Sequence, residues 1–177
     1  MDLFEAITTR RSVRRFQDRP VGEDLLERVL EAARWAPSWV NFQPTRYTVV
    51  TDPELKARLV DTMSPKNPAR KGGLQAPVLI AVSARVGLSG FAGGTALTDK
   101  GDWYMFDAAL AVQNLTLAAH ALGLGTVQVG LFDAPAAAAV LELPEGEVMV
   151  ELIPLGWPLF QPKVPPRLPL DQLVRRR

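Results

Sequence analysis

The amino-acid sequence predicts an α+β fold in which a mixed sheet is flanked by helices. Two kinds of apolar pattern lead to this prediction. The short apolar run from Val78 to Val82 is typical of a buried strand, whereas apolar residues between Glu23 and Trp35 recur at helical spacing. A third segment, Asp102 to Leu122, is apolar on nearly every face, which predicts a helix buried in a core or at a subunit contact.

The other elements follow from end signals and shorter patterns. Residues 2–10 have acids early and arginines at the end, which suits a short helix and its dipole. Asp52 and Pro53 supply an N-cap and a first-turn proline, Asp133 caps a short Ala-rich helix, and Gly123 stops the long apolar helix. The predicted helices are 2–10, 23–35, 53–62, 102–122 and 134–141, and the predicted strands are 47–50, 78–82, 126–129 and 148–155.

Three connecting segments lack such periodicity. Residues 37–44 form a loop with unusual aromatic and amide content, residues 63–76 predict a mobile basic connection, and glycine-rich residues 86–101 predict a flexible surface loop. After Gly156 the chain is rich in proline but also carries leucines, which favours an extended arm packed on a neighbouring subunit. No second domain is visible, so residues 1–177 are expected to form a single domain.

Composition excludes several classes of site. The formal net charge of +1 argues against a dedicated nucleic-acid-binding protein. The chain has no cysteine and one histidine, which excludes disulfides, thiolate nucleophiles, Cys-ligated zinc, iron–sulfur clusters and a His-rich metal site. No apolar run is long enough to span a membrane and the N-terminus is unlike a signal peptide, so a cytoplasmic location is expected. If the protein is an enzyme, a bound cofactor carries the difficult step.

A basic segment follows the first predicted helix. It contains Arg10, Arg11, Ser12 and Arg14, and guanidinium groups beside a hydroxyl are suited to a phosphate. The alternatives are a solvated basic turn and, less favoured by the net charge, nucleic acid. The chain has no P-loop, and its closely spaced glycines at 123–125 end a helix instead of following a strand, so the dinucleotide fingerprint is also missing.

Two further groups of residues are candidates for a site. The run Pro37-Ser38-Trp39-Val40-Asn41-Phe42-Gln43-Pro44 places carboxamides and a hydroxyl on a proline-stiffened loop, which can bind a polar heterocycle or a polyol; the alternative is a plain turn. Within it, Trp39 has the best claim of the four tryptophans to a role in the site. The late Arg167 is a cation held between prolines, whereas His120, among alanines and leucines, is expected to be structural.

Together and in this order, these groups resemble the nitroreductase family of FMN-dependent NAD(P)H oxidoreductases, and the resemblance covers essentially the whole chain. The matching segments are Arg10-x-Ser12-x-Arg14-x-Phe16, Pro37 to Pro44, Asn114-Leu115 with Ala118 and Gly123 to Thr126, Leu155 to Pro158, and Arg167 to Leu170. The resemblance implies a mostly antiparallel sheet and an FMN-containing homodimer. It also implies NADH or NADPH as the electron donor and no metal.

The resemblance also assigns roles to residues. Arg10 and Ser12, with Arg11 beside them and the late Arg167, are implied to hold the FMN phosphate, and Gly156 lies at a strand end near it. Arg14 is implied to lie at the N1/C2 edge of the flavin, where a fixed cation stabilises the charge of the reduced ring. The cofactor-binding loop is implied to approach the flavin partly from the second subunit. Its residues are Pro37, Ser38, Trp39, Asn41 and Gln43.

The implied reaction is two-electron reduction of small electron-poor acceptors, such as nitroaromatics, quinones or enones. Since no dinucleotide fingerprint marks a second site, the nicotinamide and the acceptor are expected to use the flavin in turn, which is a ping-pong mechanism. The chain departs from many members at Thr45, where they have Trp, and Lys66 or Asn67 is a candidate for contacting the ribityl chain. The alternatives are a flavin-binding or carrier protein without turnover and a specialised flavin reaction, such as dehalogenation or flavin cleavage. The short segment 86–101 argues against the specialised reactions, which need a substantial lid.

Overall fold

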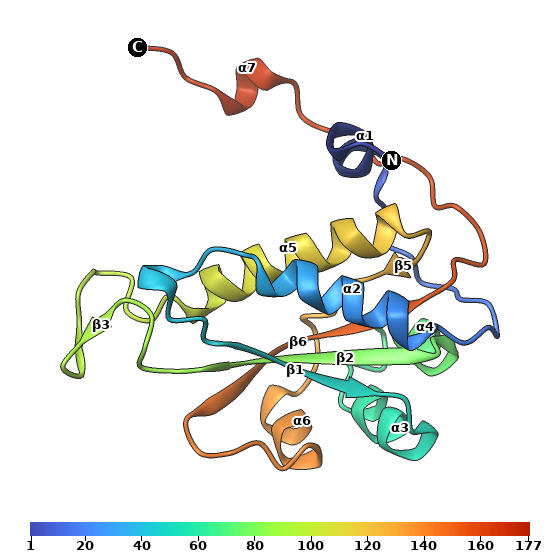
Figure 1. The fold of residues 1–177 in the computed structure, drawn as a ribbon, viewed down its shortest axis with the longest axis horizontal. Helices are drawn as coiled ribbons and strands as arrows, with labels where there is room; N and C mark the ends of the chain where they lie inside the picture. Colours follow the sequence, from blue (N-terminus) through green and yellow to red (C-terminus); the bar gives the residue numbers. More distant parts are fainter.

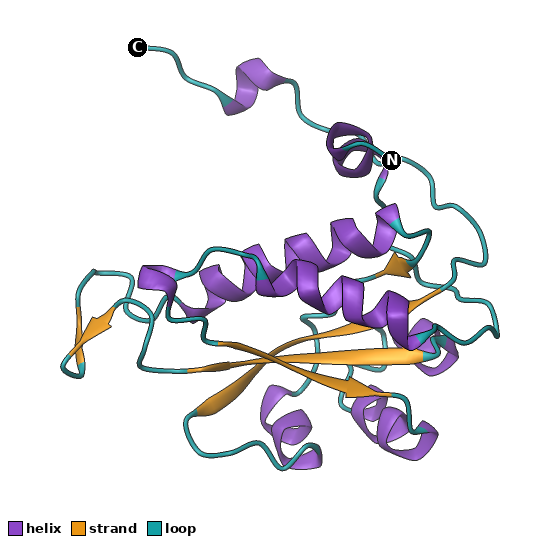
Figure 2. Ribbon diagram, in the orientation of Figure 1, coloured by secondary structure: helices purple, strands orange, loops and turns teal.

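The computed structural model describes residues 1–177 as a central sheet with helices on both faces, which confirms the predicted α+β fold (Figures 1 and 2). The longer strands are β1 (Thr45–Val50), β2 (Val78–Arg85) and β6 (Glu147–Gly156), and β5 (Gly125–Thr126) is short. The helices are α1 (Leu3–Thr9), α2 (Glu23–Arg34), α3 (Pro53–Asp61), α4 (Arg70–Gln75), α5 (Tyr104–Ala121), α6 (Ala134–Val140) and the single turn α7 (Leu170–Leu173).

The sheet has the strand order β1-β2-β6-β5, and all its strand pairs are antiparallel. Its central strand β2 explains the continuous apolar run of the sequence. Val78, Ile80 and Val82 face a core formed with α2 and α5, whereas Leu79 and Ala81 face a second core on the side of α3 and α6. Both faces of β2 are therefore covered, and the strand has no polar side to alternate with.

The long helix α5 lies across the sheet beside α2 (Figure 1). Its buried residues include Val112, Leu115 and Ala119, but its first turns expose Met105 and Phe106 by more than half. Gly123 ends the helix with φ of +82°, and the next amide, of Leu124, donates to the carbonyl of Ala119 at 2.8 Å. This is the glycine-dependent stop that the sequence predicts.

Two predicted loops contain more structure than expected. The basic connection at 63–76 ends in α4, where Arg70 donates to the carbonyls of Val60 and Met63 at 2.9 Å each. A Cβ on Gly72 would lie 2.6 Å from the Arg14 carbonyl oxygen, so α4 is closely packed. The helix α4 was not predicted, because Gly72 allows a close backbone contact that periodicity does not reveal.

The glycine-rich segment 86–101, expected to be a flexible surface loop, contains a small hairpin that the sequence analysis does not predict. Its strands are β3 (Phe91–Ala92) and β4 (Thr95–Ala96), joined by Gly93 and Gly94 at φ of +54° and +77°. Two successive positive φ angles are characteristic of a tight hairpin turn. The hairpin projects from the body at the same end as the loop before β1 (Figure 1).

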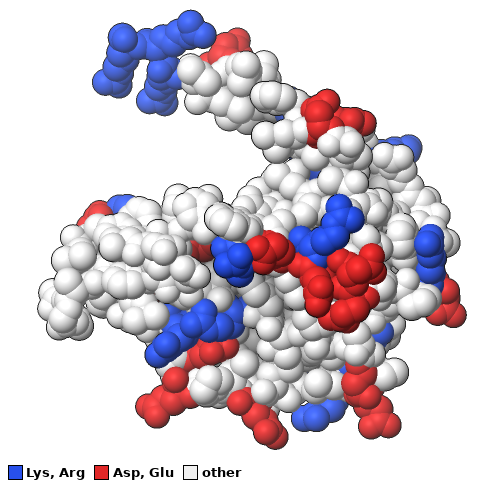
Figure 3. Space-filling model, viewed as in Figure 1, with Lys and Arg blue, Asp and Glu red and all other residues white.

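After β6 the chain leaves the body as an extended arm, which passes near α1 and carries α7 (Figures 1 and 2). Leu168, Leu170 and Leu173 of the arm are each more than 60% exposed, as are Leu3 and Phe4 of α1. The face drawn in Figure 3 carries both charge signs, with acidic side chains over α2 and arginines at the tip of the arm. None of the helices combines the length and the apolar character that a membrane-spanning segment requires.

The exposed surface is large for the size of the chain. The accessible area is 10,699 Å², whereas a compact monomer of 19.4 kDa exposes roughly 8,500 Å² by the usual scaling with mass. The difference of about 2,200 Å² is comparable to the area that obligate subunit interfaces bury. The exposed apolar side chains of α1 and the arm contribute to this area.

Candidate functional site

The basic segment after α1 is extended and pairs with the edge of the sheet. Ser12 forms a bridge with Thr126, and the amide of Val13 donates to the Thr126 carbonyl at 2.8 Å. Val13 packs on Gly125, where a Cβ would lie 2.6 Å from its side chain. Gly125 thus permits close packing, and the segment is fixed to the body.

Arg10 and Arg167 lie close enough for their charges to interact, although 157 positions separate them in the sequence. The pKa of Arg10 is lowered, first by its burial and then by the positive charges of Arg11 and Arg167. None of the three arginines takes part in an ion pair within the chain. Cations held near one another without a carboxylate form a ready site for an anion, and a phosphate fits this donor set.

His120, near the C-terminal end of α5, joins this cluster to the core. Its Nε2 lies 2.8 Å from the hydroxyl of Thr9 at the end of α1. Burial and then the charges of Arg10 and Arg11 lower the pKa of His120, so the ring is neutral at physiological pH. His120 therefore ties α1 to α5, which agrees with the structural role expected from the sequence.

Arg11 differs from the other arginines of the segment in its contacts. Its Nη1 donates to the carbonyls of Thr8 and Arg10, at 2.8 and 2.7 Å, at the end of α1. The side chain lines a separate cavity with His120, and none of Arg10, Ser12, Arg14 or Arg167 lines that cavity. The sequence-based assignment groups Arg11 with the phosphate site, whereas the structure gives it surroundings of its own.

The loop at 37–44 contains the short 3-10 turn η1 (Trp39–Asn41) and is held by its own polar groups. The amide of Gln43 donates to the Ser38 hydroxyl at 2.9 Å, and the side chains of Gln43 and Asn41 are hydrogen-bonded at 3.2 Å. Asn41 and Gln43 adopt left-handed φ angles of +57° and +50°. Such angles are uncommon outside glycine and cluster at functional sites.

This loop also borders a cavity of about 1,020 Å³, which Pro37, Ser38 and Gln43 help to line. Trp39 stacks near Trp103, with ring centroids 5.3 Å apart, and Trp103 in turn contacts Phe106. The loop therefore presents polar groups beside a cluster of aromatic rings. That combination suits a planar heterocycle with polar edges.

Asp107 is a residue that the sequence reasoning missed. It is only 3% exposed, and its carboxylate accepts from the Trp39 amide at 3.0 Å and from the Ser89 hydroxyl at 2.6 Å. It thereby joins α5, the 37–44 loop and the base of the hairpin segment. The available signal was a lone carboxylate in the first turn of an otherwise apolar helix.

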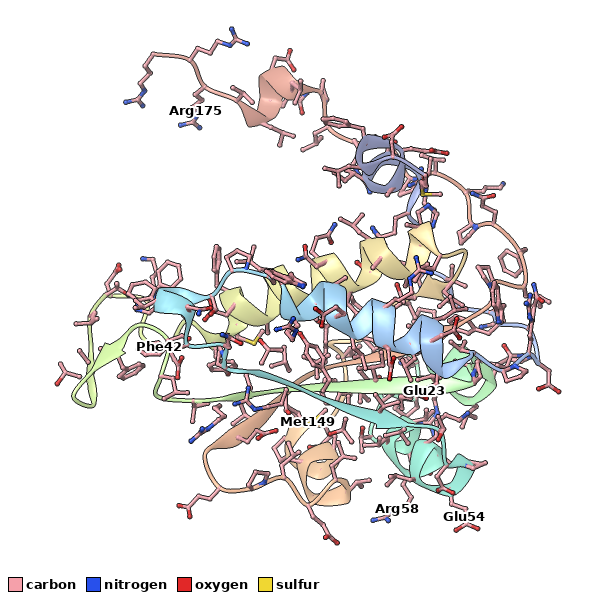
Figure 4. The ribbon with its side chains drawn as sticks, viewed as in Figure 1. Glu23, Phe42, Glu54, Arg58, Met149 and Arg175 are labelled. Carbon is pink, nitrogen blue, oxygen red and sulfur yellow. The ribbon has the colours of Figure 1, made fainter.

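Within one chain, the two parts of the expected site, the loop at 37–44 and the arginine cluster, lie apart. The loop contacts α5 at Asp107, whereas Thr9, next to Arg10, contacts it at His120, 13 positions further along. At the helical rise per residue this separation is about 20 Å. Figure 4 shows Phe42, a residue of the loop, at the end of the molecule where the hairpin lies. Glu23, at the start of α2, lies at the other end.

The remaining residues expected at the cofactor site either pack within the chain or are exposed to solvent. Gly156 ends β6 opposite Gly125, and a Cβ there would lie 2.5 Å from Pro77. The side chain of Asn67 accepts from the Ala69 amide at 2.9 Å and donates to the Leu131 carbonyl at 3.3 Å, and Lys66 is exposed. Arg14 is also exposed, so it is free to meet a ligand. No group of three or more His, Asp or Glu residues is arranged to hold a metal ion.

Comparison with known proteins gives consistent matches. The sequence model of a family described as "Nitroreductase family" matches residues 7–157. A Methanothermobacter thermautotrophicus protein named NADH dehydrogenase/NAD(P)H nitroreductase is 34% identical over 166 residues, covering 92% of this chain and 80% of the relative. FMN reductase (NAD(P)H) of Bacillus subtilis is 29% identical, covering 96% of this chain and 71% of that protein.

Two further matches bear on structure and on range of activity. The crystal structure of a nitroreductase family protein from Clostridium novyi NT superposes with a TM-score of 0.79 at 29% identity, covering 89% of this chain and 86% of that one. Iodotyrosine deiodinase 1 of Sus scrofa is 28% identical, covering 98% of this chain and 68% of the relative.

Proposed function

Because this chain belongs to the nitroreductase family, we propose that it is an FMN-dependent oxidoreductase that reduces small electron-poor acceptors with NADH or NADPH. Nitroaromatics, quinones and enones are the acceptor classes. The relatives named NAD(P)H nitroreductase and FMN reductase support both the cofactor and the donor. Bound FMN would supply the redox chemistry by taking up a hydride equivalent from the nicotinamide and passing electrons to the acceptor.

The observation that carries this proposal is that Arg167 lies close enough to Arg10 for its positive charge to lower the pKa of Arg10. Their mutual repulsion contributes to the lowered pKa of Arg10, and no carboxylate of the chain neutralises them. A phosphate monoester with two negative charges would relieve this repulsion and accept several charge-assisted hydrogen bonds. We assign Arg10, Ser12 and Arg167 to the FMN phosphate on this basis.

The other residues of the site have electrostatic and positioning roles. Arg14 follows the phosphate residues on the same fixed segment and is exposed, so its guanidinium can stabilise negative charge at the N1 edge of the flavin. The chain offers no cysteine and its one histidine is engaged with Thr9, so solvent is the source of protons in the proposed reaction.

A homodimer completes the proposed site. The loop of Ser38, Trp39, Asn41 and Gln43 contacts α5 about 20 Å from the point where Thr9, next to Arg10, contacts the same helix. The loop of a second copy, approaching the cluster, would provide polar contacts to the flavin ring. The surplus exposed area and the apolar residues of α1 and the arm support such an interface.

Two other activities remain in competition with this proposal. The deiodinase relative shows that specialised chemistry occurs among similar proteins, but the corresponding lid segment here is a small hairpin of two-residue strands. We therefore favour general acceptor reduction. A carrier protein without turnover would bind FMN but would not oxidise NAD(P)H in the presence of any acceptor.

The experiment that tests the assignment measures FMN affinity in Arg10→Ala and Arg167→Ala. Each charge-assisted hydrogen bond is worth ~1.5–3 kcal/mol, so each variant should bind FMN roughly ten- to a hundredfold more weakly. Arg58→Ala is the matched control, because Arg58 lies on the far face of the sheet in α3 (Figure 4). Unchanged affinity in Arg10→Ala would remove Arg10 from the site. NAD(P)H oxidation with a panel of acceptors separates the enzyme from a carrier.

A further inference from the structure

The helix α4 lies against the backbone of Arg14. Gly72, in the middle of this helix, is buried, and a Cβ on it would lie 2.6 Å from the carbonyl oxygen of Arg14 and 3.3 Å from its Cα. Real Cβ atoms essentially never approach another atom as closely as the first of these distances, so glycine is the residue that allows the contact. The position of α4 therefore limits the position of the Arg14 backbone.

The residues on either side of Arg14 pack on the end of the same helix. Val13 and Phe16 are 5% and 3% exposed, and they form a small apolar cluster with Ala76, the residue that caps α4. The Arg14 carbonyl also accepts a hydrogen bond from Nη1 of Arg15 at 2.7 Å. Arg14 as a whole is nevertheless exposed. Its backbone is thus fixed from several sides, whereas its side chain is free to meet a ligand.

Both ends of α4 are fastened to α3. At the first residue of α4, Arg70 donates to the carbonyls of Val60 and Met63 at 2.9 Å each. At the other end, Nζ of Lys56 donates to the Ala76 carbonyl at 2.6 Å. Lys56 is only 9% exposed and takes part in no ion pair within the chain, so this helix-ending carbonyl is the partner of its buried ammonium.

We propose that Gly72 and Lys56 are positioning residues for Arg14, which hold its backbone where the guanidinium best stabilises the reduced flavin. This inference rests on the proposed function, which places Arg14 at the N1 edge of the ring. The interaction between two charges depends on their separation, so a displaced guanidinium stabilises the reduced ring less. Gly72 and Lys56 act through Arg14 and need no contact with FMN.

The midpoint potential of bound FMN tests the proposal, because it reports how much more tightly the protein binds the reduced cofactor than the oxidised one. Arg14→Gln should lower this affinity ratio by roughly tenfold or more, since a charge-assisted interaction is lost. Gly72→Ala should lower the ratio severalfold, because its Cβ displaces the Arg14 backbone. Gly73→Ala is the matched control: it adds the same methyl group to the same helix, but against the side chains of Val60 and Met63, and should leave the potential unchanged.

A second variant tests the other end of α4. Lys56→Met retains the length of the side chain but loses the hydrogen bond to Ala76, and it should shift the potential in the same direction as Gly72→Ala. Because Lys56→Met also removes a charge, both changes are repeated in the Arg14→Gln protein. Neither should shift the potential further there, since no guanidinium remains to be displaced. Circular dichroism and the affinity for oxidised FMN show that each variant is folded.

Equal potentials in Gly72→Ala and Gly73→Ala, with the Arg14→Gln shift present, would overturn the proposal. So would an effect of Gly72→Ala or Lys56→Met that persists in the Arg14→Gln protein, because it would act through another group, such as the exposed Lys71 of α4. Absence of a shift in Arg14→Gln itself would instead refute the role that the proposed function gives to Arg14, and this inference with it.

Discussion

The free energy of unfolding of this protein should fall as the pH rises, because the carboxyl of Glu151 is more stable in its neutral form. It lies on β6 opposite Val82 of β2, which lies opposite Tyr47 of β1, so the three side chains share the face of the sheet that α5 and α2 cover. Burial raises the pKa of Glu151 from 4.5 to about 7 and that of Tyr47 to about 12. Both groups are thus more stable in their neutral forms.

The magnitude follows from the two pKa values of Glu151. Because the pKa is higher in the folded state, the stabilisation is fully present below the unfolded value of 4.5 and is lost as the pH rises through about 7. At ~1.4 kcal/mol per pH unit, ionisation of the buried carboxyl costs about 3 kcal/mol at pH 8. Glu151→Gln removes the ionisation and retains the shape of the side chain.

Urea unfolding at several pH values measures this effect, with protein and FMN concentrations held constant because binding also stabilises the folded state. At about pH 8 the Glu151→Gln variant should be more stable than the wild type by about 3 kcal/mol, and near pH 4 the difference should vanish. Glu54→Gln is the control, because Glu54 is exposed on α3. A Glu151→Gln variant that is no more stable than the wild type at pH 8 would refute the reasoning.

Three further predictions concern assembly, kinetics and the loop. Light scattering should give twice the chain mass at low micromolar concentration, because α1 and the arm expose apolar residues that a second copy can cover; a folded monomer that retains FMN contradicts this. Initial rates with NAD(P)H and acceptor varied together should give parallel double-reciprocal lines, and intersecting lines would show that both bind at once. Asp107→Ala removes two hydrogen bonds to a buried carboxylate, worth ~1.5–3 kcal/mol each. In steady-state assays this variant should raise the KM for the electron acceptor at least tenfold. Asp107→Asn retains an oxygen that can accept a hydrogen bond, so its effect on KM should be smaller. Equal KM values in all three proteins would show that the loop does not depend on Asp107.

Elements with strong local signals were predictable from the sequence. Asp52 and Asp133 cap their helices as expected, with side-chain oxygens accepting from the amides three residues later at 2.8 and 3.0 Å. Gly123 stops α5 for a similar reason, since the left-handed residue that ends a helix is most easily glycine. By contrast, α4 and the β3–β4 hairpin were not predicted. The close backbone packing of α4 and the two-glycine turn of the hairpin produce no apolar periodicity in the sequence.

By itself, the sequence determined the family, the α+β class and the chemistry of the candidate residues, since caps, periodicity and motif order are properties of short segments. Only the tertiary structure decided which of those residues meet. It placed Arg167 close enough to Arg10 for their charges to interact, set Arg11 in the wall of a separate cavity, and placed the amide loop at the opposite end of α5. These relations depend on strand register, on the direction of an extended backbone and on the length of one rigid helix, none of which a local pattern encodes.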